Sequence, residues 1–207
     1  IRRCFMKCFV TGADESYADI LDWFIYNYNQ HISLPLYIAD FGLKRTYPNS
    51  FKINWKDNAW YYKPRAIKEC PSDQVCWIDV DCEILADISD VFELTKKDIG
   101  VTEDFCRTRS WNPYGLLPLA TGVCCFNSKN QLLDDWIKES ESRQHRGDQE
   151  ALNHLLKNHD QVSFLPRGYQ WLRLAEPNNQ IKVMHWTGND GKYIIRNNET
   201  INGKKPT

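Results

Sequence analysis

The chain has 207 residues, of which 42% are hydrophobic, and its 26 basic and 27 acidic side chains leave a formal net charge of −1. A chain of this length suits one domain with a buried core and would bury roughly 70% of its unfolded surface on folding. The near-neutral charge gives no argument for a nucleic acid or an anionic membrane as partner, so any anion-binding site must be local.

The sequence predicts a cytoplasmic protein without a membrane span. Cations interrupt the apolar residues of segment 1–7, which is not the pattern of a secretory signal, and no run of 18 apolar residues follows. No two of the eight cysteines have Cys-x-x-Cys spacing, and most lie in apolar, strand-like runs, where a thiol behaves as a small hydrophobic group. This pattern favours reduced thiols.

Strand and helix patterns alternate along the chain, which favours a layered α/β domain. The first strand is expected over 5–11 and ends at Gly12; Ser16 then caps a helix with apolar residues at helical spacing. Pro64 fits the first turn of a second, short helix. Further patterns predict strands over 35–39, 75–79, 99–102, 119–126, 162–165 and 181–185, and helices over 132–140 and 148–156.

We expect a single domain over residues 1–207, because no internal linker interrupts these patterns. The polar, turn-rich residues 197–207 are expected to form a loosely held tail. The chain does not begin with Met, so it can be one module of a longer polypeptide.

The most informative motif follows the strand expected over 75–79, where Asp79 and Asp81 flank Val80. Side chains alternate along a strand, so the two carboxylates point to the same side and repel each other unless a cation lies between them. Ligands of open α/β sheets bind at the carboxyl ends of strands, and Mg²⁺ or Mn²⁺ is commonly held there by carboxylates and substrate phosphates. The motif predicts a divalent-ion site that also holds a diphosphate; a solvated acidic turn is the alternative.

His185 ends the strand expected over 181–185, and Gly188, Gly191 and Lys192 follow it. A neutral imidazole is a suitable ligand for an ion such as Mn²⁺, and glycines let backbone N–H groups approach a phosphate. We therefore interpret His185 as the third ligand and Lys192 as a cation on the diphosphate. The alternative is a structural histidine in the core.

Five segments, in order along nearly the whole chain, resemble the GT-A-fold glycosyltransferases and, among them, the glycogenin-like group. They are Phe9-Val10-Thr11 with Tyr17, Asp79-Val80-Asp81, Thr121-Gly122-Val123 with Phe126-Asn127, Gly147-Asp148-Gln149, and His185 with Gly188 and Lys192. The match is most similar to the small glycosyltransferase modules encoded by chlorella viruses. The resemblance implies a GT-A fold with a Rossmann-like, mostly parallel twisted sheet flanked by helices.

The resemblance also implies roles in binding a nucleotide diphosphate sugar: Thr11 and Tyr17 at the base, Asp79, Asp81 and His185 on Mn²⁺ or Mg²⁺, Gly188 and Lys192 on the diphosphate, and Thr121 and Gly122 beside the sugar. Either Lys63 or Arg65 would face the donor from the family's basic helix. The final motif departs from the family, which usually has two residues between its glycine and lysine, followed by Pro-Trp. Here three residues separate Gly188 from Lys192, so Arg196 or Lys204 can take the place of Lys192.

Asp148 stands at the start of the helix expected over 148–156. The helix dipole stabilises a carboxylate in the first turn by about 0.3–1 kcal/mol, and this structural role is one interpretation. The other places Asp148 beside the donor sugar, as a hydrogen-bond partner or as the base for the acceptor. Glu103 and Asp104 are second candidates for that base.

These features together predict a metal-dependent glycosyltransferase that moves a hexose from a UDP-sugar, or a related donor, to a hydroxyl of a glycan acceptor. The viral resemblance implies an acceptor on a structural glycoprotein, and a loop with Arg107, Arg109 and Trp111 is a candidate acceptor site. Two other hypotheses stay open: a metal-dependent hydrolase of nucleotide sugars or phosphate esters, and a nucleotide-sugar-binding module without catalysis.

Overall fold

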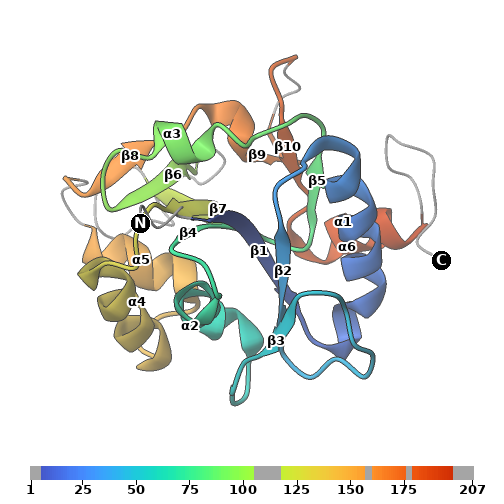
Figure 1. Ribbon diagram of the computed structural model, residues 1–207, viewed down its shortest axis with the longest axis horizontal. Helices are drawn as coiled ribbons and strands as arrows, with labels where there is room; N and C mark the ends of the chain where they lie inside the picture. Colours follow the sequence, from blue (N-terminus) through green and yellow to red (C-terminus); the bar gives the residue numbers. More distant parts are fainter. Residues whose placement is uncertain (1–5, 105–117, 157–159, 176–178, 198–207) are drawn as a thin grey trace.

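A seven-stranded sheet forms the centre of the fold in the computed structural model, which describes residues 6–104, 118–156, 160–175 and 179–197 (Figure 1). In sheet order, the strands are β3 (Ser50–Lys52), β2 (Leu36–Asp40), β1 (Lys7–Ala13), β4 (Gln74–Ile78), β7 (Leu119–Phe126), β6 (Ile99–Glu103) and β8 (Val162–Phe164). All neighbours are parallel except that β7 is antiparallel to both β4 and β6. The predicted mostly parallel α/β sheet is therefore confirmed.

Alternation of side chains along the strands divides the core into two layers. On β1, Cys8 and Val10 face one side of the sheet and Phe9 faces the other. The first side packs against α2 (Lys63–Glu69), α4 (Gln131–Glu141) and α5 (Asp148–Leu155), and the second against α1 (Ala18–His31), α3 (Val91–Leu94) and α6 (Gly188–Asn197). In Figure 1 the helices α2, α4 and α5 gather on one side of the molecule, while α1 and α6 lie side by side on the other. Because both faces are covered, the central strands are mostly apolar.

A smaller, three-stranded sheet extends the fold beyond β4. It contains β5 (Cys82–Ile84), β10 (Val183–His185) and β9 (Trp171–Leu172) in that order, with β10 antiparallel to β5 and parallel to β9. Buried Ile84 and Val183 belong to the same hydrophobic cluster as Phe9 of the large sheet. The two sheets therefore share a continuous core.

The first helix begins later than the sequence predicts. Asp14, and not Ser16, provides the cap: its carboxylate accepts a hydrogen bond from the Ser16 N–H (2.8 Å) and opens a 3₁₀ turn, η1 (Glu15–Tyr17). Consequently α1 starts at Ala18 without a side-chain cap. The prediction that Gly12 ends the first strand was also wrong, because β1 continues to pair with β2 as far as Ala13.

The remaining predicted elements are all present, with ends that differ by at most two residues. The short elements β3, β5, β9 and α3 were not predicted, since two to four residues carry no usable periodicity. The ten-residue helix α6 was not predicted either, because Gly188 and Gly191 in its first turns disfavour a helix. The expected tail was placed one residue too early: Asn197 completes α6, and its amide donates to the Tyr193 carbonyl (2.8 Å). Residues 198–207 lie outside the described ranges.

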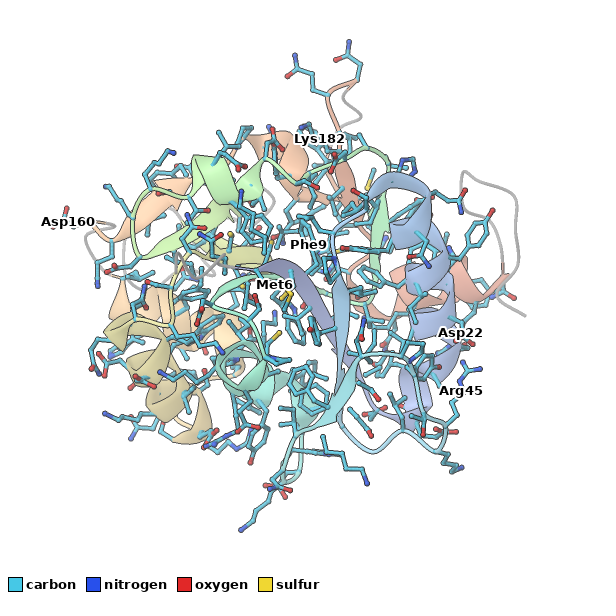
Figure 2. The ribbon with its side chains drawn as sticks, viewed as in Figure 1. Met6, Phe9, Asp22, Arg45, Asp160 and Lys182 are labelled. Atoms are coloured by element: carbon cyan, nitrogen blue, oxygen red, sulfur yellow. The ribbon has the colours of Figure 1, made fainter. Side chains whose placement is uncertain are left out.

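Most large apolar side chains of the described residues lie in the core. Figure 2 shows Phe9 in the interior and the paired side chains of Asp22 and Arg45 at the periphery. The described cysteines are buried free thiols: Cys8, Cys70, Cys76, Cys82, Cys124 and Cys125. Within the described ranges, no helix combines the length and apolar character needed to cross a membrane.

Candidate active site

A cavity of about 470 Å³ opens at the carboxyl ends of β1 and β4. This is the edge at which open α/β sheets bind ligands, and the volume falls in the usual range of small-molecule pockets, about 300–1,000 Å³. Its walls come from stretches far apart in sequence, represented by Asp14 and Tyr17 after β1, Trp60 and Lys63 around η2 (Ala59–Tyr62), Asp79 and Asp81 after β4, and His185, Gly188 and Lys192 at the start of α6.

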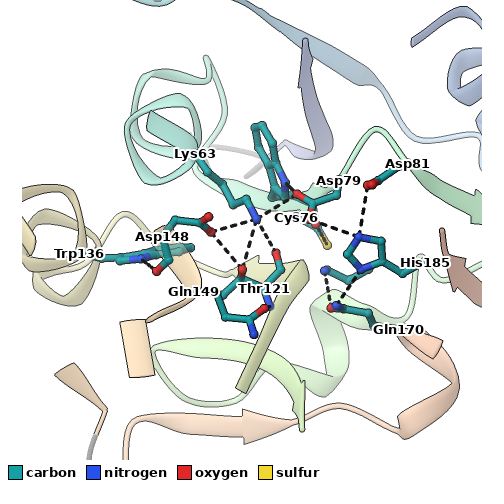
Figure 3. Close-up of polar contacts among 12 residues, drawn as sticks. Lys63, Cys76, Asp79, Asp81, Thr121, Trp136, Asp148, Gln149, Gln170 and His185 are labelled. Atoms are coloured by element: carbon teal, nitrogen blue, oxygen red, sulfur yellow. Dashed lines mark hydrogen bonds and ion pairs between the residues drawn. The ribbon is translucent and has the colours of Figure 1, made fainter. Parts of the chain in front are cut away.

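The structure brings the three predicted metal ligands together in this cavity (Figure 3). His185 Nε2 lies 3.2 Å from Asp81 Oδ1 and 3.8 Å from Asp79 Oδ2. The small sheet produces this approach: in the β5–β10 ladder His185 is opposite Cys82, and the Trp186 N–H donates to the Asp81 carbonyl (2.9 Å).

Asp81 and His185 fit a divalent ion. Neighbouring ligands of an octahedral ion at 2.0–2.1 Å lie about 3 Å apart, close to the 3.2 Å between these two donors, and carboxylate and imidazole are donors that Mn²⁺ accepts. Asp79 is not part of the group whose donor atoms all lie within 4.8 Å of one another, so its carboxylate must move toward Asp81 to bind the same ion. The Cys82 thiol is also within 4.8 Å of the donor atoms of Asp81 and His185. Burial, and then the charges of Asp79 and Asp81, raise the pKa of this thiol well above its usual value, so it is the weakest donor of the group.

Two lysines balance the acidic pair: Lys192 Nζ lies 2.7 Å from Asp81 Oδ2, and Lys63 Nζ lies 2.9 Å from Asp79 Oδ1. Burial alone would raise the pKa of Asp81, but the charges of His185 and Lys192 outweigh it and hold the pKa well below its usual range. Burial lowers the pKa of His185, yet the charges of Asp81 and Asp79 bring the net pKa above its ordinary value. The two carboxylates therefore make the His185 ring easier to protonate than a free imidazole.

Gln170 contacts the His185 ring at its second nitrogen. The Val123 N–H donates to Gln170 Oε1 (2.7 Å), which turns Gln170 Nε2 toward His185 Nδ1 at 3.3 Å. Gly122 leaves room for this contact, because a Cβ at that position would lie 2.7 Å from Gln170 Nε2 and 2.8 Å from His185 Nδ1. Gly122 itself does not line the cavity. Its place is behind the histidine, where only a residue without a side chain fits.

Lys63 lies at the centre of a second polar cluster (Figure 3). Besides Asp79, its buried Nζ contacts Asp148 Oδ2 (3.0 Å) and the carbonyl and hydroxyl oxygens of Thr121 (3.1 and 3.2 Å). Burial lowers the pKa of Lys63, but the charges of Asp148 and Asp79 more than offset this and raise it. Lys63 therefore stays cationic between two carboxylates.

Asp148 begins α5 and faces the cavity, as Thr121 does. The Thr121 hydroxyl donates to Asp148 Oδ2 (3.0 Å), and the Trp136 indole donates to the Asp148 carbonyl (2.8 Å), so both ends of the residue are held. Burial raises the pKa of the Asp148 carboxyl; Lys63 opposes this shift and Asp79 adds to it. Lys63 and Thr121 thus position the carboxylate and Trp136 fixes the backbone, which suits a group that must meet a substrate at one orientation.

Other predicted residues lie elsewhere. Arg65 does not line the cavity and pairs with Glu141 (2.6 Å) and Glu69 (3.5 Å). Thr11 is fully buried in β1, so its side chain cannot contact a ligand in the cavity. Asp104 is buried, contacts Gln149 (3.0 Å) and, like Glu103, is absent from the cavity wall. Lys204 and the loop with Arg107, Arg109 and Trp111 lie outside the described residues.

Tyr17 and the start of α6 do line the cavity. Lys192 Nζ lies 5.7 Å from the centre of the Tyr17 ring, and the Arg196 guanidinium lies 5.9 Å from it; Arg196 also pairs with Asp19 (2.7 Å). Gly188 opens α6 with a φ of +80°, a backbone conformation that favours glycine. The N-terminus of a ten-residue helix therefore meets the cavity, where its N–H groups and dipole favour an anion.

Several site residues have no clear signal in the sequence. Trp60 lines the cavity with 60% of its surface exposed, unusual for so large an apolar side chain. Gln149 belongs to the Gly147-Asp148-Gln149 segment, but no role was predicted for it; it lines the cavity next to Asp148, and its Oε1 accepts from the Thr121 N–H (3.2 Å). Gln170 has no motif of its own, because only the folded chain places it beside His185.

The sheet, its covering helices and the cavity at the strand ends define a GT-A fold, the fold that the sequence resemblance implied. No protein-family model and no curated protein matches the sequence. Among solved structures, the chain is similar to the galactosyltransferase LgtC in complex with donor and acceptor sugar analogues, with a TM-score of 0.68 and 15% identity over 88% of this chain and 87% of that chain.

Two further glycosyltransferases share the fold. GlyE of Streptococcus pneumoniae TIGR4 matches with a TM-score of 0.63 and 19% identity over 89% of this chain and 55% of that chain. The bifunctional glycosyltransferase WbbM matches with a TM-score of 0.66 and 14% identity over 91% of this chain and 47% of that chain. The chain thus spans about half the length of these two proteins.

Proposed function

We propose that the protein is a metal-dependent glycosyltransferase that moves a sugar from a nucleotide diphosphate sugar to a hydroxyl of a glycan. The observation that carries the proposal is the convergence of Asp79, Asp81, His185 and Lys192 at one cavity, although more than 100 residues separate Asp81 from His185 along the chain. LgtC, GlyE and WbbM, which share the fold, are glycosyltransferases, and the LgtC structure contains donor and acceptor sugar analogues.

Asp79, Asp81 and His185 hold the ion, and Mn²⁺ and Mg²⁺ are the candidates because the donors are mainly oxygen. When bound, the ion supplies Lewis-acid stabilisation of the charge on the departing diphosphate. Lys192 and the N-terminus of α6 at Gly188 bind the diphosphate oxygens from the protein side. This division of roles follows from the position of Lys192, 2.7 Å from Asp81 and at the cavity wall.

Tyr17 stacks on the uracil of the donor, a role that the sequence resemblance implies and with which its place at the cavity wall agrees. Thr11, which is fully buried, supports β1 below this position without touching the base. Lys63 holds Asp79 and Asp148 at fixed positions, and Asp148 with Thr121 contacts the donor sugar or accepts the proton of the acceptor hydroxyl. Arg65 has no direct part in this arrangement.

The more specific proposals, on the donor, the acceptor and the group within the glycosyltransferases, rest on the sequence. A UDP-sugar donor, the glycogenin-like group and an acceptor on a viral structural glycoprotein follow from the resemblance alone. A cytoplasmic location agrees with the buried free thiols of the described cysteines. A single domain agrees with the core that the two sheets share.

The test is a screen of nucleotide sugars with Mn²⁺ that measures release of the nucleoside diphosphate with and without glycan acceptors. A transferase releases UDP faster when its acceptor is present and loses this activity with EDTA. Asp81→Asn should lower the rate by about 100-fold or more, since loss of one preorganised electrostatic contact typically costs that much. Asp135→Asn, on the exposed side of α4, is the matched control and should keep the wild-type rate.

Each other outcome replaces the proposal by a defined alternative. Release of UDP and free sugar at a rate that acceptors do not change indicates a hydrolase. Tight binding of UDP and Mn²⁺ without turnover of any donor indicates a binding module. Equal activity of the Asp81→Asn variant and the wild type would remove the ion site from the mechanism.

A further inference from the structure

A second group of metal-ligating side chains lies outside the cavity, where α4 meets α5. The described residues hold two groups of three such donors, and the second consists of Glu139, His145 and His154. Glu139 lies on α4, His145 on the connection to α5, and His154 on α5 itself. The proposed transferase chemistry uses none of the three.

The two histidines direct the same ring nitrogen at one carboxylate oxygen. His145 Nε2 lies 2.6 Å and His154 Nε2 3.7 Å from Glu139 Oε1, and the ring centres are 5.0 Å apart. The side chains are 9%, 36% and 24% exposed for His145, His154 and Glu139, so an ion can reach them from solvent. Both histidines direct Nε2 at the same Glu139 oxygen, which is the arrangement expected where one ion is bound by all three side chains.

The donor atoms match a tetrahedral ion after small shifts. Zn²⁺ binds imidazole nitrogen and carboxylate oxygen at about 2.0–2.2 Å, which puts tetrahedral neighbours about 3.3 Å apart. The observed separations of 2.6 and 3.7 Å bracket this value, and all the donor atoms lie within 4.8 Å of one another. Two imidazoles with one carboxylate favour zinc over Mg²⁺ or Mn²⁺, for which oxygen-rich sites are usual.

We propose that Glu139, His145 and His154 form a zinc site that ties the α4–α5 connection to both helices. Its fourth position is open to water. The connection leads directly to Asp148, and its His145 carbonyl accepts a hydrogen bond from the Tyr61 hydroxyl (3.0 Å) of η2. Zinc at this position stabilises the wall of the cavity from behind without touching the donor.

The experiment is a titration with Zn²⁺, followed by calorimetry, on the wild type and on His154→Gln. The number of bound zinc ions should fall by one in the variant, or the affinity of one site should drop about 100-fold or more. The control is His31→Gln at the end of α1, which removes a histidine and leaves zinc binding unchanged. Because the Asp79–Asp81–His185 site can also bind zinc, the series is repeated in a His185→Gln background, where one zinc should remain.

Two readouts separate a metal site from a purely structural ion pair. Zn²⁺ at 100 times its dissociation constant should raise the melting temperature of the His185→Gln protein by about 5–10 °C, and His154→Gln should abolish this rise. Co²⁺ in place of Zn²⁺ should give the visible absorption of a tetrahedral ion in the same protein and none after His154→Gln. Equal zinc stoichiometry and equal affinity with and without His154, in both backgrounds, would overturn the proposal.

Discussion

Replacing Lys63 by methionine tests whether the cavity is held together by a buried cation. Lys63 is 6% exposed and contacts Asp79 and Asp148, whose side chains are 23% and 10% exposed. Methionine keeps the length and apolar stem of lysine but removes the charge. The two carboxylates are then left facing each other across the site with no cation between them.

The expected loss follows from this geometry. Removing one partner of a buried ion pair typically costs about 3–5 kcal/mol, mainly because the remaining charge stays buried without compensation. Burial already raises the pKa of Asp148, and Lys63 is the main influence that lowers it. Without Lys63 this carboxyl binds a proton more readily in the folded state, so the destabilisation should be greater at pH 8 than at pH 5.

The assay is urea unfolding followed by tryptophan fluorescence, with EDTA present so that no divalent ion compensates the carboxylates. Lys63→Met should lose about 3–5 kcal/mol of unfolding free energy at pH 8. Adding Asp148→Asn should restore part of the loss, because it removes the uncompensated charge. Lys138→Met, whose lysine is 75% exposed and pairs with Asp135, should change stability by less than about 0.5 kcal/mol.

Two results would contradict this reasoning. A loss below about 1 kcal/mol for Lys63→Met would show that the carboxylates do not depend on the buried cation. A double variant with Asp148→Asn that is no more stable than Lys63→Met alone would show that repulsion between the carboxylates is not the cause.

Two further predictions concern His185 and its surroundings. Gln170→Glu should raise the Mn²⁺ affinity measured by calorimetry about tenfold. An ion bound at His185 Nε2 leaves the ring hydrogen on Nδ1, where a Glu carboxylate accepts it and the Gln170 amide nitrogen does not. Gln131→Glu on α4 is the control, and an unchanged or weaker affinity of Gln170→Glu refutes the assignment. Mn²⁺ affinity should also fall as pH drops through the raised pKa of His185, so the loss begins above the usual value of about 6.5. A wild-type affinity that stays flat from pH 8 to pH 5 would argue against His185 as a ligand.

The sequence by itself determined the layered α/β fold and the position of the acidic pair. Both depend on local patterns: the run over 119–126 is mostly apolar because β7 is covered on both faces, and its ends were predicted to the residue. The position of Asp79 and Asp81 just after β4 could be predicted, since a strand buried on both faces cannot continue through two carboxylates. Such features need no knowledge of which segments meet in space.

Only the tertiary structure decided which cations and supporting residues belong to the site. Lys63 and Arg65 are two positions apart on one short helix, so their sequence contexts are alike, yet the rotation of α2 directs Lys63 into the cavity and leaves Arg65 with Glu141. Gln170 reaches His185 only through the pairing of β9 with β10 and the absence of a side chain at Gly122. The physical reason is that a helix turns about 100° per residue and a sheet joins strands distant in the chain, so contacts between elements depend on packing that no local pattern records.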